Sequence, residues 1–271
     1  MNHHLTPAEL AMREKDPDWT PYSLPRDPSE RSRLDLQHTA WSAAVNYLLH
    51  PRIRASLPCD AQSVNIAEVG TGTGVWLHEL SASCPTGWTF TGYDISDAQF
   101  PTAVNGASHT VRFEILNILT PIPEHLKGTC DVVHIRLLVC GLVGADWTTL
   151  AKNVLELLKP GGWIHWHEGD LPSMKVLQSG SGASTRACKR LVELGIANSQ
   201  RVGKFMPHDV VGLFKTVAAA GYEDCAVDEF ASDRVAGLRE TISETMWKAL
   251  MALSRYAVES TGAEVAGVTA E

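Results

Sequence analysis

Three glycines occupy alternate positions, Gly70, Gly72 and Gly74, directly after the apolar run of residues 66–69. A glycine-rich turn between a strand and a helix lets a ligand approach the backbone, because glycine lacks a Cβ atom and adopts positive φ. The acid Glu68 precedes this turn. Asp94 ends a second strand-like run, where its carboxylate can accept hydrogen bonds from the hydroxyls of a ribose. These residue types at this spacing predict a nucleoside-binding site.

The turn departs from the fingerprint of dinucleotide-binding proteins, in which a third small residue packs the helix under a pyrophosphate. Val75 stands at that place. The turn also contains no lysine or arginine, and it lacks the Gly-Lys-Ser/Thr sequence of a phosphate-binding loop. A nucleoside without phosphates therefore fits this turn better than NAD or ATP.

Four segments match a known family in their order along the chain. They are residues 68–74 (Glu-Val-Gly-Thr-Gly-Thr-Gly), 113–118 (Phe-Glu-Ile-Leu-Asn-Ile), 130–138 (Cys-Asp-Val-Val-His-Ile-Arg-Leu-Leu) and 157–166 (Leu-Leu-Lys-Pro-Gly-Gly-Trp-Ile-His-Trp). With these segments the chain resembles the class I S-adenosylmethionine-dependent methyltransferases. Residues 30–38, Glu-Arg-Ser-Arg-Leu-Asp-Leu-Gln-His, are similar to a stretch of fungal small-molecule methyltransferases, a group that includes enzymes of secondary metabolism and a global-regulator branch.

The resemblance implies S-adenosylmethionine as the cofactor. It also implies an α/β fold: a doubly wound, Rossmann-like, mostly parallel sheet with an N-terminal helical cap and an inserted helical lid. Three of the implied contacts have alternatives: His38 could bond within the core, Arg136 could be a surface charge, and Tyr22 requires the N-terminal arm to fold back. The implied cofactor-binding residues are Tyr22, His38, Glu68, Gly70, Thr71, Gly72, Asp94, Ile95, Asn117, Ile118 and Arg136.

Candidate catalytic residues gather at the end of the expected strand 162–167. Methyl transfer to a hydroxyl or a protonated amine needs a base, for which histidine is the usual residue near neutral pH. Alternation along a strand places His165 and His167 on one face, and Trp166 and Glu168 on the other. Ligands of open α/β sheets bind beyond the carboxyl ends of the strands. We therefore predict His167 and Glu168 as base or substrate anchor, with a histidine packed beneath a helix as the alternative for His167.

Hydrophobic periodicity predicts alternating strands and helices, the pattern of a parallel sheet with helices on both faces. Four regions follow: an arm and helical cap (1–50), a cofactor-binding core (51–172), a helical lid (173–204) and a C-terminal part of the core (205–271). The expected strands are 64–69, 88–94, 111–115, 131–135, 162–167 and 222–230. The expected helices are 31–49, 74–83, 97–103, 146–158, 209–220 and 237–260, with further helical spacing within 173–201.

The C-terminal region departs from the family's pattern, because no β-rich run follows residue 260 to form a seventh strand. A missing strand leaves its neighbours with unpaired backbone groups, each costing about 1–3 kcal/mol if buried. The strand is therefore either absent or supplied by another chain, which would make the protein a homo-oligomer that completes this edge of the sheet.

Composition limits the partners and the compartment. The net charge is -8, whereas nucleic-acid binding generally needs a basic face, so we expect no nucleic-acid partner. Six cysteines are scattered without zinc-type spacing, which favours reduced thiols and no metal site. No apolar run reaches 18 residues, and the first 30 residues contain charges and prolines. We expect a cytoplasmic protein without a membrane segment.

The predicted function is methyl transfer from S-adenosylmethionine to an oxygen, nitrogen or sulfur atom of a small molecule such as a secondary metabolite. Two alternatives stay open at this point. The domain could use the bound cofactor in a rearrangement or cyclisation without methyl transfer, or it could be a non-catalytic regulatory subunit with the same fold.

Overall fold

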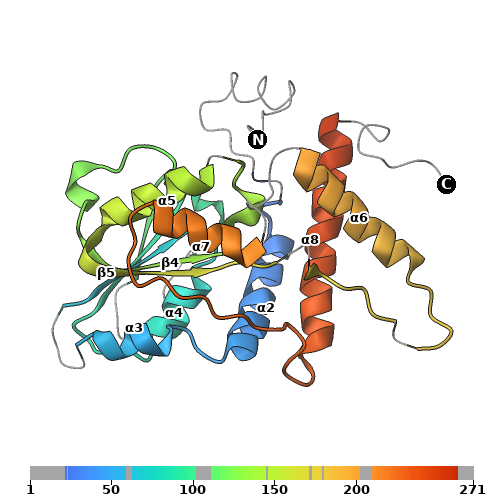
Figure 1. Cartoon of the computed structure of the whole chain (residues 1–271), viewed down its shortest axis with the longest axis horizontal. Coiled ribbons are helices and arrows are strands. Elements are labelled where there is room, and N and C mark those ends of the chain that lie inside the picture. Colours follow the sequence, from blue (N-terminus) through green and yellow to red (C-terminus); the bar gives the residue numbers. More distant parts are fainter. Residues whose placement is uncertain are drawn as a thin grey trace.

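The computed structural model describes residues 22, 24–58, 63–101, 111–144, 146–170, 173–178, 180–201 and 209–261. Within these residues five parallel strands form one sheet in the order β3-β2-β1-β4-β5. Helices cover both faces of this sheet (Figure 1), so the predicted doubly wound α/β fold is confirmed. The strands are β1 (Asn65–Val69), β2 (Thr89–Asp94), β3 (Val111–Ile115), β4 (Cys130–Arg136) and β5 (Leu158–His167).

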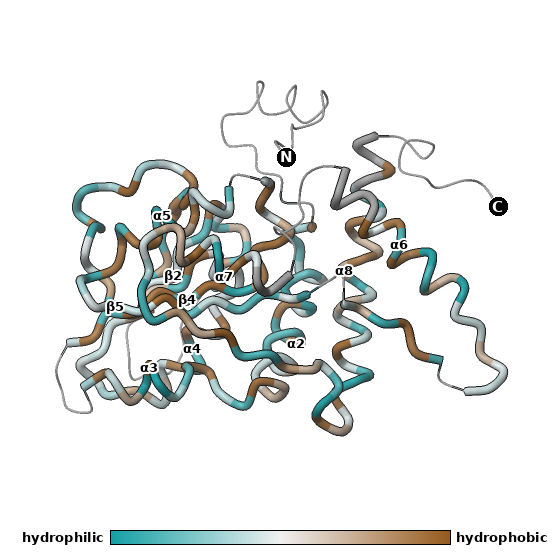
Figure 2. The backbone as a smooth tube through the Cα atoms, viewed as in Figure 1, coloured by the Kyte–Doolittle hydropathy of each residue, from teal (hydrophilic) through white to brown (hydrophobic). Residues whose placement is uncertain are grey.

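Two apolar clusters, one on each face of the sheet, form the core. Strands that are buried on both faces read as continuous apolar runs, and alternate residues turn to opposite sides. Ala67 and Val69 join the cluster under helix α5 (Asp146–Leu157). Ile66 joins the cluster formed with helix α4 (Val75–Ser81). In Figure 2, hydrophobic residues accordingly recur along the central strands.

The N-terminal cap is helix α2 (Pro28–Val45), which begins at the N-cap Asp27. The predicted end at residue 49 is wrong, because Asn46 takes a left-handed conformation (φ 70°) and its N–H bonds to the Ser42 carbonyl at 2.7 Å. Pro51 starts a second helix, α3 (Pro51–Ser56), because its fixed φ suits a first helical turn.

Strand β5 begins four residues before the predicted start. The Lys-Pro-Gly-Gly segment, expected as a turn before the strand, is part of it, and the pairing register shifts between Cys130 and Val132 to accommodate the extra residues. Gly161 adopts a positive φ of 77° there. Lys159 fixes this irregularity through an ion pair with Asp131 at 2.7 Å.

The C-terminal helices are α6 (Arg186–Arg201), α7 (Asp209–Ala219) and α8 (Leu238–Thr261). α8 packs against α2, and α6 packs against α8, so this pair extends to one side of the sheet (Figure 1). α6 alternates hydrophobic and hydrophilic residues along its length (Figure 2). Of the predicted helix 97–103, the structure shows the 3₁₀ turn η1 (Asp97–Gln99), and residues 102–103 lie outside the described residues.

The predicted sixth strand, residues 222–230, is wrong. No strand is assigned there, and the described sheet ends at β5. Asp224 has a positive φ of 50°, which interrupts an extended chain. Side chains hold this segment instead: the Tyr222 hydroxyl donates to the Ala151 carbonyl at 2.9 Å, and His50 bonds to Asp228 at 3.0 Å.

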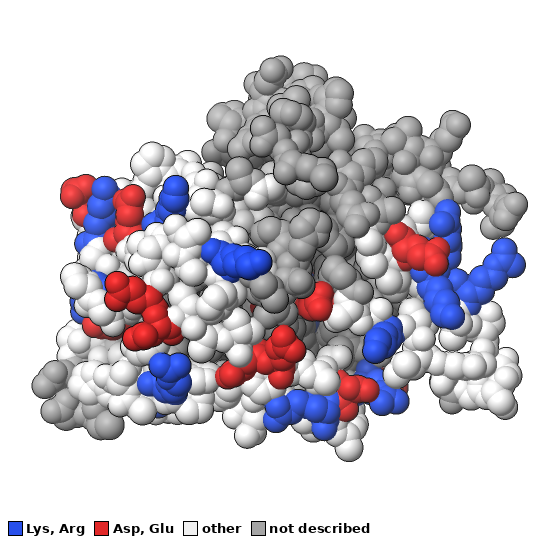
Figure 3. Space-filling model, viewed as in Figure 1, with Lys and Arg blue, Asp and Glu red and all other residues white. Residues whose placement is uncertain are grey.

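Charged side chains are dispersed over the surface. On the face in Figure 3, basic and acidic residues are interspersed and form no continuous basic surface among the described residues. Within that part of the chain no helix is both long and apolar enough to cross a membrane. The described residues also contain no group of His, Cys, Asp and Glu side chains that could hold a metal ion.

Candidate functional site

The glycine turn joins β1 to α4, as the sequence predicts, and all three glycines have positive φ, between 53° and 70°. A Cβ atom on Gly70 would overlap the side chain of Leu138, and one on Gly74 would overlap the ring of Phe113. At Gly72 a Cβ atom would meet only Leu34, at 3.6 Å. The outer two glycines therefore allow close packing, whereas Gly72 keeps its backbone accessible beneath α2.

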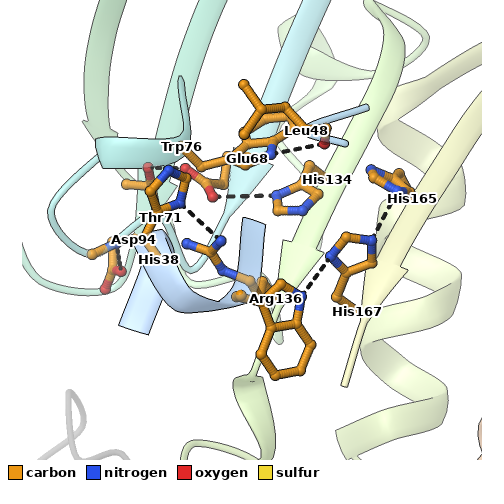
Figure 4. A network of polar contacts seen from close by, with 12 residues as sticks. His38, Leu48, Glu68, Thr71, Trp76, Asp94, His134, Arg136, His165 and His167 are labelled. Atoms are coloured by element: carbon orange, nitrogen blue, oxygen red, sulfur yellow. Dashed lines mark hydrogen bonds and ion pairs between the residues drawn. The ribbon is translucent and has the colours of Figure 1, made fainter. Parts of the chain in front are cut away.

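Asp94 lies at the carboxyl end of β2, beside this turn (Figure 4). Its Oδ2 accepts the Gly72 N–H at 2.9 Å, and its Oδ1 accepts the Ser96 N–H at 3.2 Å. Burial raises the pKa of Asp94, and these hydrogen bonds oppose the rise. Each carboxylate oxygen keeps a further lone pair that can accept from a ribose hydroxyl.

Glu68 and Thr71 meet beneath the turn. The Thr71 hydroxyl donates to Glu68 Oε2 at 2.7 Å, and Glu68 Oε1 lies 3.2 Å from His134 Nδ1 (Figure 4). Burial raises the pKa of Glu68 to about 7, although nearby Arg136 favours the ionised form. Glu68 thus joins β1, the turn and β4 into one polar network.

Arg136 lies at the carboxyl end of β4, and it bonds to a histidine of the cap. Its Nη1 donates to His38 Nδ1 at 3.0 Å (Figure 4). The other ring nitrogen, His38 Nε2, pairs with Glu79 of α4. His38 is 2% exposed, and burial followed by the charge of Arg136 lowers its pKa. The alternative of a core hydrogen bond for His38 is therefore observed, and Arg136 is not a free surface charge.

Three histidines of β4 and β5 form a buried cluster, which we call the histidine cluster: His134, His165 and His167. His165 and His167 share one face of β5, as predicted, with their Nε2 atoms 2.9 Å apart. Trp41 of α2 donates its indole N–H to His167 Nδ1 at 3.1 Å. The pKa of His167 falls to about 3, because burial and the charge of Arg136 disfavour its protonation.

Glu168 follows β5 and lies on the other face, with Trp166. Its Oε1 accepts the Leu138 N–H at 2.8 Å and the Trp166 indole N–H at 3.3 Å. Burial raises the pKa of Glu168 to about 7. Its Oε2 is buried and has no hydrogen-bond partner among the described residues. Leu138 is the same residue that packs on Gly70, so Glu168 is anchored next to the glycine turn.

The remaining predicted cofactor residues lie at neighbouring strand ends. Ile95 follows β2, and Asn117 and Ile118 follow β3; the Leu116 N–H bonds to the Asp94 carbonyl at 2.8 Å, which holds the two ends together. The Tyr22 ring lies beside Gly141, which follows β4 by five residues, and Arg26 stacks over the Tyr22 ring. The structure thus brings the predicted residues together at the carboxyl ends of the strands.

Comparison with known proteins identifies this arrangement. Residues 67–164, from β1 into β5, match the family model described as a methyltransferase domain. Residues 67–164 are thus similar to a methyltransferase domain, and the parallel sheet that they help to build fits the class I fold of S-adenosylmethionine-dependent methyltransferases. The match includes the glycine turn, Asp94 and Arg136, and it ends just before the histidines and the glutamate that close β5.

Curated relatives of this methyltransferase domain come from fungi. Methyltransferase grgD of Penicillium sp is 41% identical over 169 residues, which cover 59% of this chain and 56% of the relative. N-methyltransferase sirN of Leptosphaeria maculans is 33% identical over 162 residues, covering 60% and 54%. The chain thus spans just over half the length of these relatives. A solved structure of Haemonchus contortus phosphoethanolamine N-methyltransferase 2 is 16% identical, covering 83% of this chain and 45% of that one, with a TM-score of 0.45.

The residues of the methyltransferase domain fit S-adenosylmethionine. The molecule carries a ribose, an amino-acid carboxylate and no phosphate. Asp94 offers acceptors for the ribose, and the accessible backbone of Gly72 allows close approach. Arg136 offers a cation, and no ion pair joins it to a carboxylate among the described residues. The turn itself, residues 70–74, contains no lysine or arginine.

Sequence reasoning missed two residues of the methyltransferase domain's polar network, Trp41 and Glu79. Trp41 lies one helical turn after His38, which was a usable signal for a shared face. Glu79 gave none, because its partner His38 is 41 residues away in the sequence. His134 is a histidine at the end of the expected fourth strand, but its partner Glu68, 66 residues away, could not be predicted. Such contacts depend on how α2 and β1 pack against α4 and β4.

Proposed function

We propose that this protein transfers the methyl group of S-adenosylmethionine to an oxygen, nitrogen or sulfur atom of a small molecule. The glycine turn supports this proposal, because it presents Gly72 between an acceptor for a sugar, Asp94, and a cation for a carboxylate, Arg136. The matched relative sirN is named an N-methyltransferase, which favours nitrogen among the three acceptor atoms.

In this proposal, residues at different strand ends bind different parts of the cofactor. Asp94 holds the ribose, Ile95, Asn117 and Ile118 flank the adenine, and Arg136 binds the carboxylate. Tyr22, His38, Glu68, Gly70, Thr71 and Gly72 complete this site. The cofactor supplies a methyl group on a positively charged sulfur. The chain's own task is to hold the acceptor in line, and such positioning supplies about 7–11 kcal/mol of a barrier.

Glu168 is the stronger candidate for the base. A general base works best when its pKa lies near the working pH, and the pKa of Glu168 is about 7. Its Oε2 has no hydrogen-bond partner among the described residues, so it can take a proton from a substrate hydroxyl or amine. Oε1 stays fixed by Leu138, which keeps the carboxyl group next to the glycine turn.

His167 stays a candidate substrate anchor. Both of its ring nitrogens face protein partners, Trp41 and His165, so a role as base would require it to give up one of these contacts. Its neutral state suits an anchor, since a neutral ring can exchange one hydrogen bond without moving a charge. We propose that the cap helix α2 and the lid region 173–204, with α6, enclose the substrate beside it.

The free edge of β5 supports a proposal on assembly. The sheet of the described residues ends at β5, and the segment 222–230 runs without pairing to it. We propose that a second copy of this chain covers this edge, because unpaired strand edges are otherwise prone to association. Light scattering after size-exclusion chromatography should then report a homo-oligomer. We also place the protein in the cytoplasm, which the five free cysteines of the described residues support.

The test of the function is binding followed by product mass. Calorimetry of the purified protein should show binding of S-adenosylmethionine and none of NAD. Incubation with isotope-labelled S-adenosylmethionine and a panel of amines, phenols and thiols should then yield a product heavier by one labelled methyl group. Binding of NAD in preference would contradict the proposal. A product without the added methyl would indicate a rearrangement or cyclisation instead.

A further inference from the structure

Arg136 is a cation in an unusual setting. It lies at the end of a buried strand, and its one hydrogen bond to a described side chain goes to a histidine instead of a carboxylate. Burial lowers the pKa of this guanidinium, while Glu68 and Glu79 oppose the effect through space. A buried cation is costly unless it is paired. This setting points to an anionic ligand group as its partner.

The hydrogen-bond directions from Arg136 outward follow from the chemistry of each group. A guanidinium only donates, so His38 Nδ1 must accept, and the single proton of the neutral ring is then on Nε2. This Nε2–H donates to the Glu79 carboxylate. Among the described residues, the series of hydrogen bonds from Arg136 through His38 ends at the carboxylate of Glu79, whose side chain is 53% exposed.

The sheet order indicates which end of a ligand Arg136 faces. β1, with the glycine turn, lies between β2 and β4. Asp94 ends β2 and Arg136 ends β4, so a nucleoside that places its ribose on Asp94 extends its other end over the turn toward Arg136. In S-adenosylmethionine that end is an amino acid with a carboxylate.

We propose that Glu79 is a positioning residue: it fixes the His38 ring with its Nδ1 lone pair on Arg136, and thereby aims the guanidinium at the carboxylate of the cofactor's amino-acid end. This inference rests on the proposed function, because it takes S-adenosylmethionine as the ligand. Without Glu79, the His38 ring can exchange its tautomer or turn over, and Arg136 loses its fixed orientation.

Two ligands separate positioning from a general structural effect. S-adenosylhomocysteine contains the amino-acid end, whereas 5′-methylthioadenosine shares the adenine, ribose and sulfur but lacks it. In Glu79→Ala, calorimetry should show S-adenosylhomocysteine binding about tenfold more weakly, with 5′-methylthioadenosine unchanged. Removing the negative charge of Glu79 would by itself strengthen the binding of a ligand with a carboxylate. Weaker binding in Glu79→Ala would therefore show that Arg136 has lost its orientation.

Two further variants complete the experiment. Glu79→Gln should restore affinity, because its amide oxygen also accepts from His38 Nε2–H. Arg136→Lys should reproduce the selective loss, because lysine keeps the charge but not the planar donor geometry. Glu124→Ala, which removes an exposed acid elsewhere, serves as the control for charge.

Equal weakening of both ligands in Glu79→Ala, or no weakening of either, would overturn the positioning role. Wild-type protein that binds neither ligand would overturn the proposed function and this inference with it. Wild-type protein that binds both, without a selective loss in Glu79→Ala and Arg136→Lys, would overturn the inference alone.

Discussion

Asp94 combines two tasks in one carboxylate, since it accepts the Gly72 N–H and has lone pairs left for a ribose. Asp94→Ala should therefore weaken S-adenosylmethionine binding at least about tenfold, because hydrogen bonds to a charged group contribute about 1.5–3 kcal/mol. Calorimetry measures this change. Asp97→Ala removes an exposed acid three residues further on and should leave the affinity as it is. Unchanged affinity in Asp94→Ala would count against the site.

Glu168 is expected to act on the rate and not on cofactor affinity. Glu168→Gln keeps the shape of the side chain but cannot take a proton, so methyl transfer to a hydroxyl or protonated amine should slow by about 10²–10⁴. In the wild type the rate should rise with pH through about 7, because the base must lose its proton first. The variant should lose this rise.

A parallel variant, His167→Gln, tests the other candidate. Its pKa of about 3 means that His167 is already neutral across the working range, so it cannot produce a rise in rate near pH 7. A large loss of rate in His167→Gln together with normal activity in Glu168→Gln would reverse the two assignments.

The residues of the candidate site could be predicted from the sequence better than the hydrogen-bond partners of those residues. The glycines, Asp94 and Arg136 could be predicted because their roles follow from local chain direction and from strand ends. That Glu79 reaches Arg136 through His38 could not, because it depends on the angle at which α2 crosses α4. The same holds for the hydrogen bond between Trp41 and His167, which joins the cap to β5.

At the scale of elements, the glycine turn shows how packing adds to backbone strain. Gly74 and Gly128 both have positive φ, 70° and 62°, where a Cβ atom costs about 1–2 kcal/mol. At Gly74 the new Cβ atom would also overlap the Phe113 ring, whereas Gly128 has nothing within 4 Å. Gly74→Ala should thus destabilise the protein by about 1–3 kcal/mol more than Gly128→Ala.

Urea unfolding of the two variants measures this difference in the free energy of unfolding. Gly128→Ala is the matched control, because it carries the same backbone strain without the overlap. Equal losses in both variants would show that Phe113 moves aside without cost, and that the turn tolerates a side chain beneath β3.

The elements themselves were predictable where periodicity and end signals agreed. β1 to β4 lie within one residue of their predicted bounds at each end. The apolar runs of β1 and β4 are unambiguous because both strands are buried on both faces. The strand expected at 222–230 rested on the resemblance of residues 221–224 to the family's turn into a sixth strand, and it failed because Asp224 takes a left-handed conformation. Helix α3 was missed because a proline marks both the end of one helix and the start of another.

At the scale of the whole molecule, buried ionisable groups set the response of stability to pH. His134, His165 and His167 have folded-state pKa values far below 6.5, so between those values the unfolded chain binds three more protons than the folded one. Glu68 and Glu168 act in the opposite sense. Their pKa values of about 7 exceed 4.5, so between pH 4.5 and 7 the folded chain binds two more protons.

Between pH 6.5 and 4.5 the histidines and the glutamates act in opposite directions, so stability should fall only gradually as the pH falls. Below pH 4.5 both glutamates are protonated in either state, so the histidines act unopposed and stability should fall more steeply. Urea unfolding at a series of pH values should show this change of slope near pH 4.5. His165→Gln removes one of these buried histidines, so its stability should fall less steeply with falling pH than that of the wild type. A uniform slope in both proteins would mean that water reaches the histidine cluster in the folded state and lets it titrate normally.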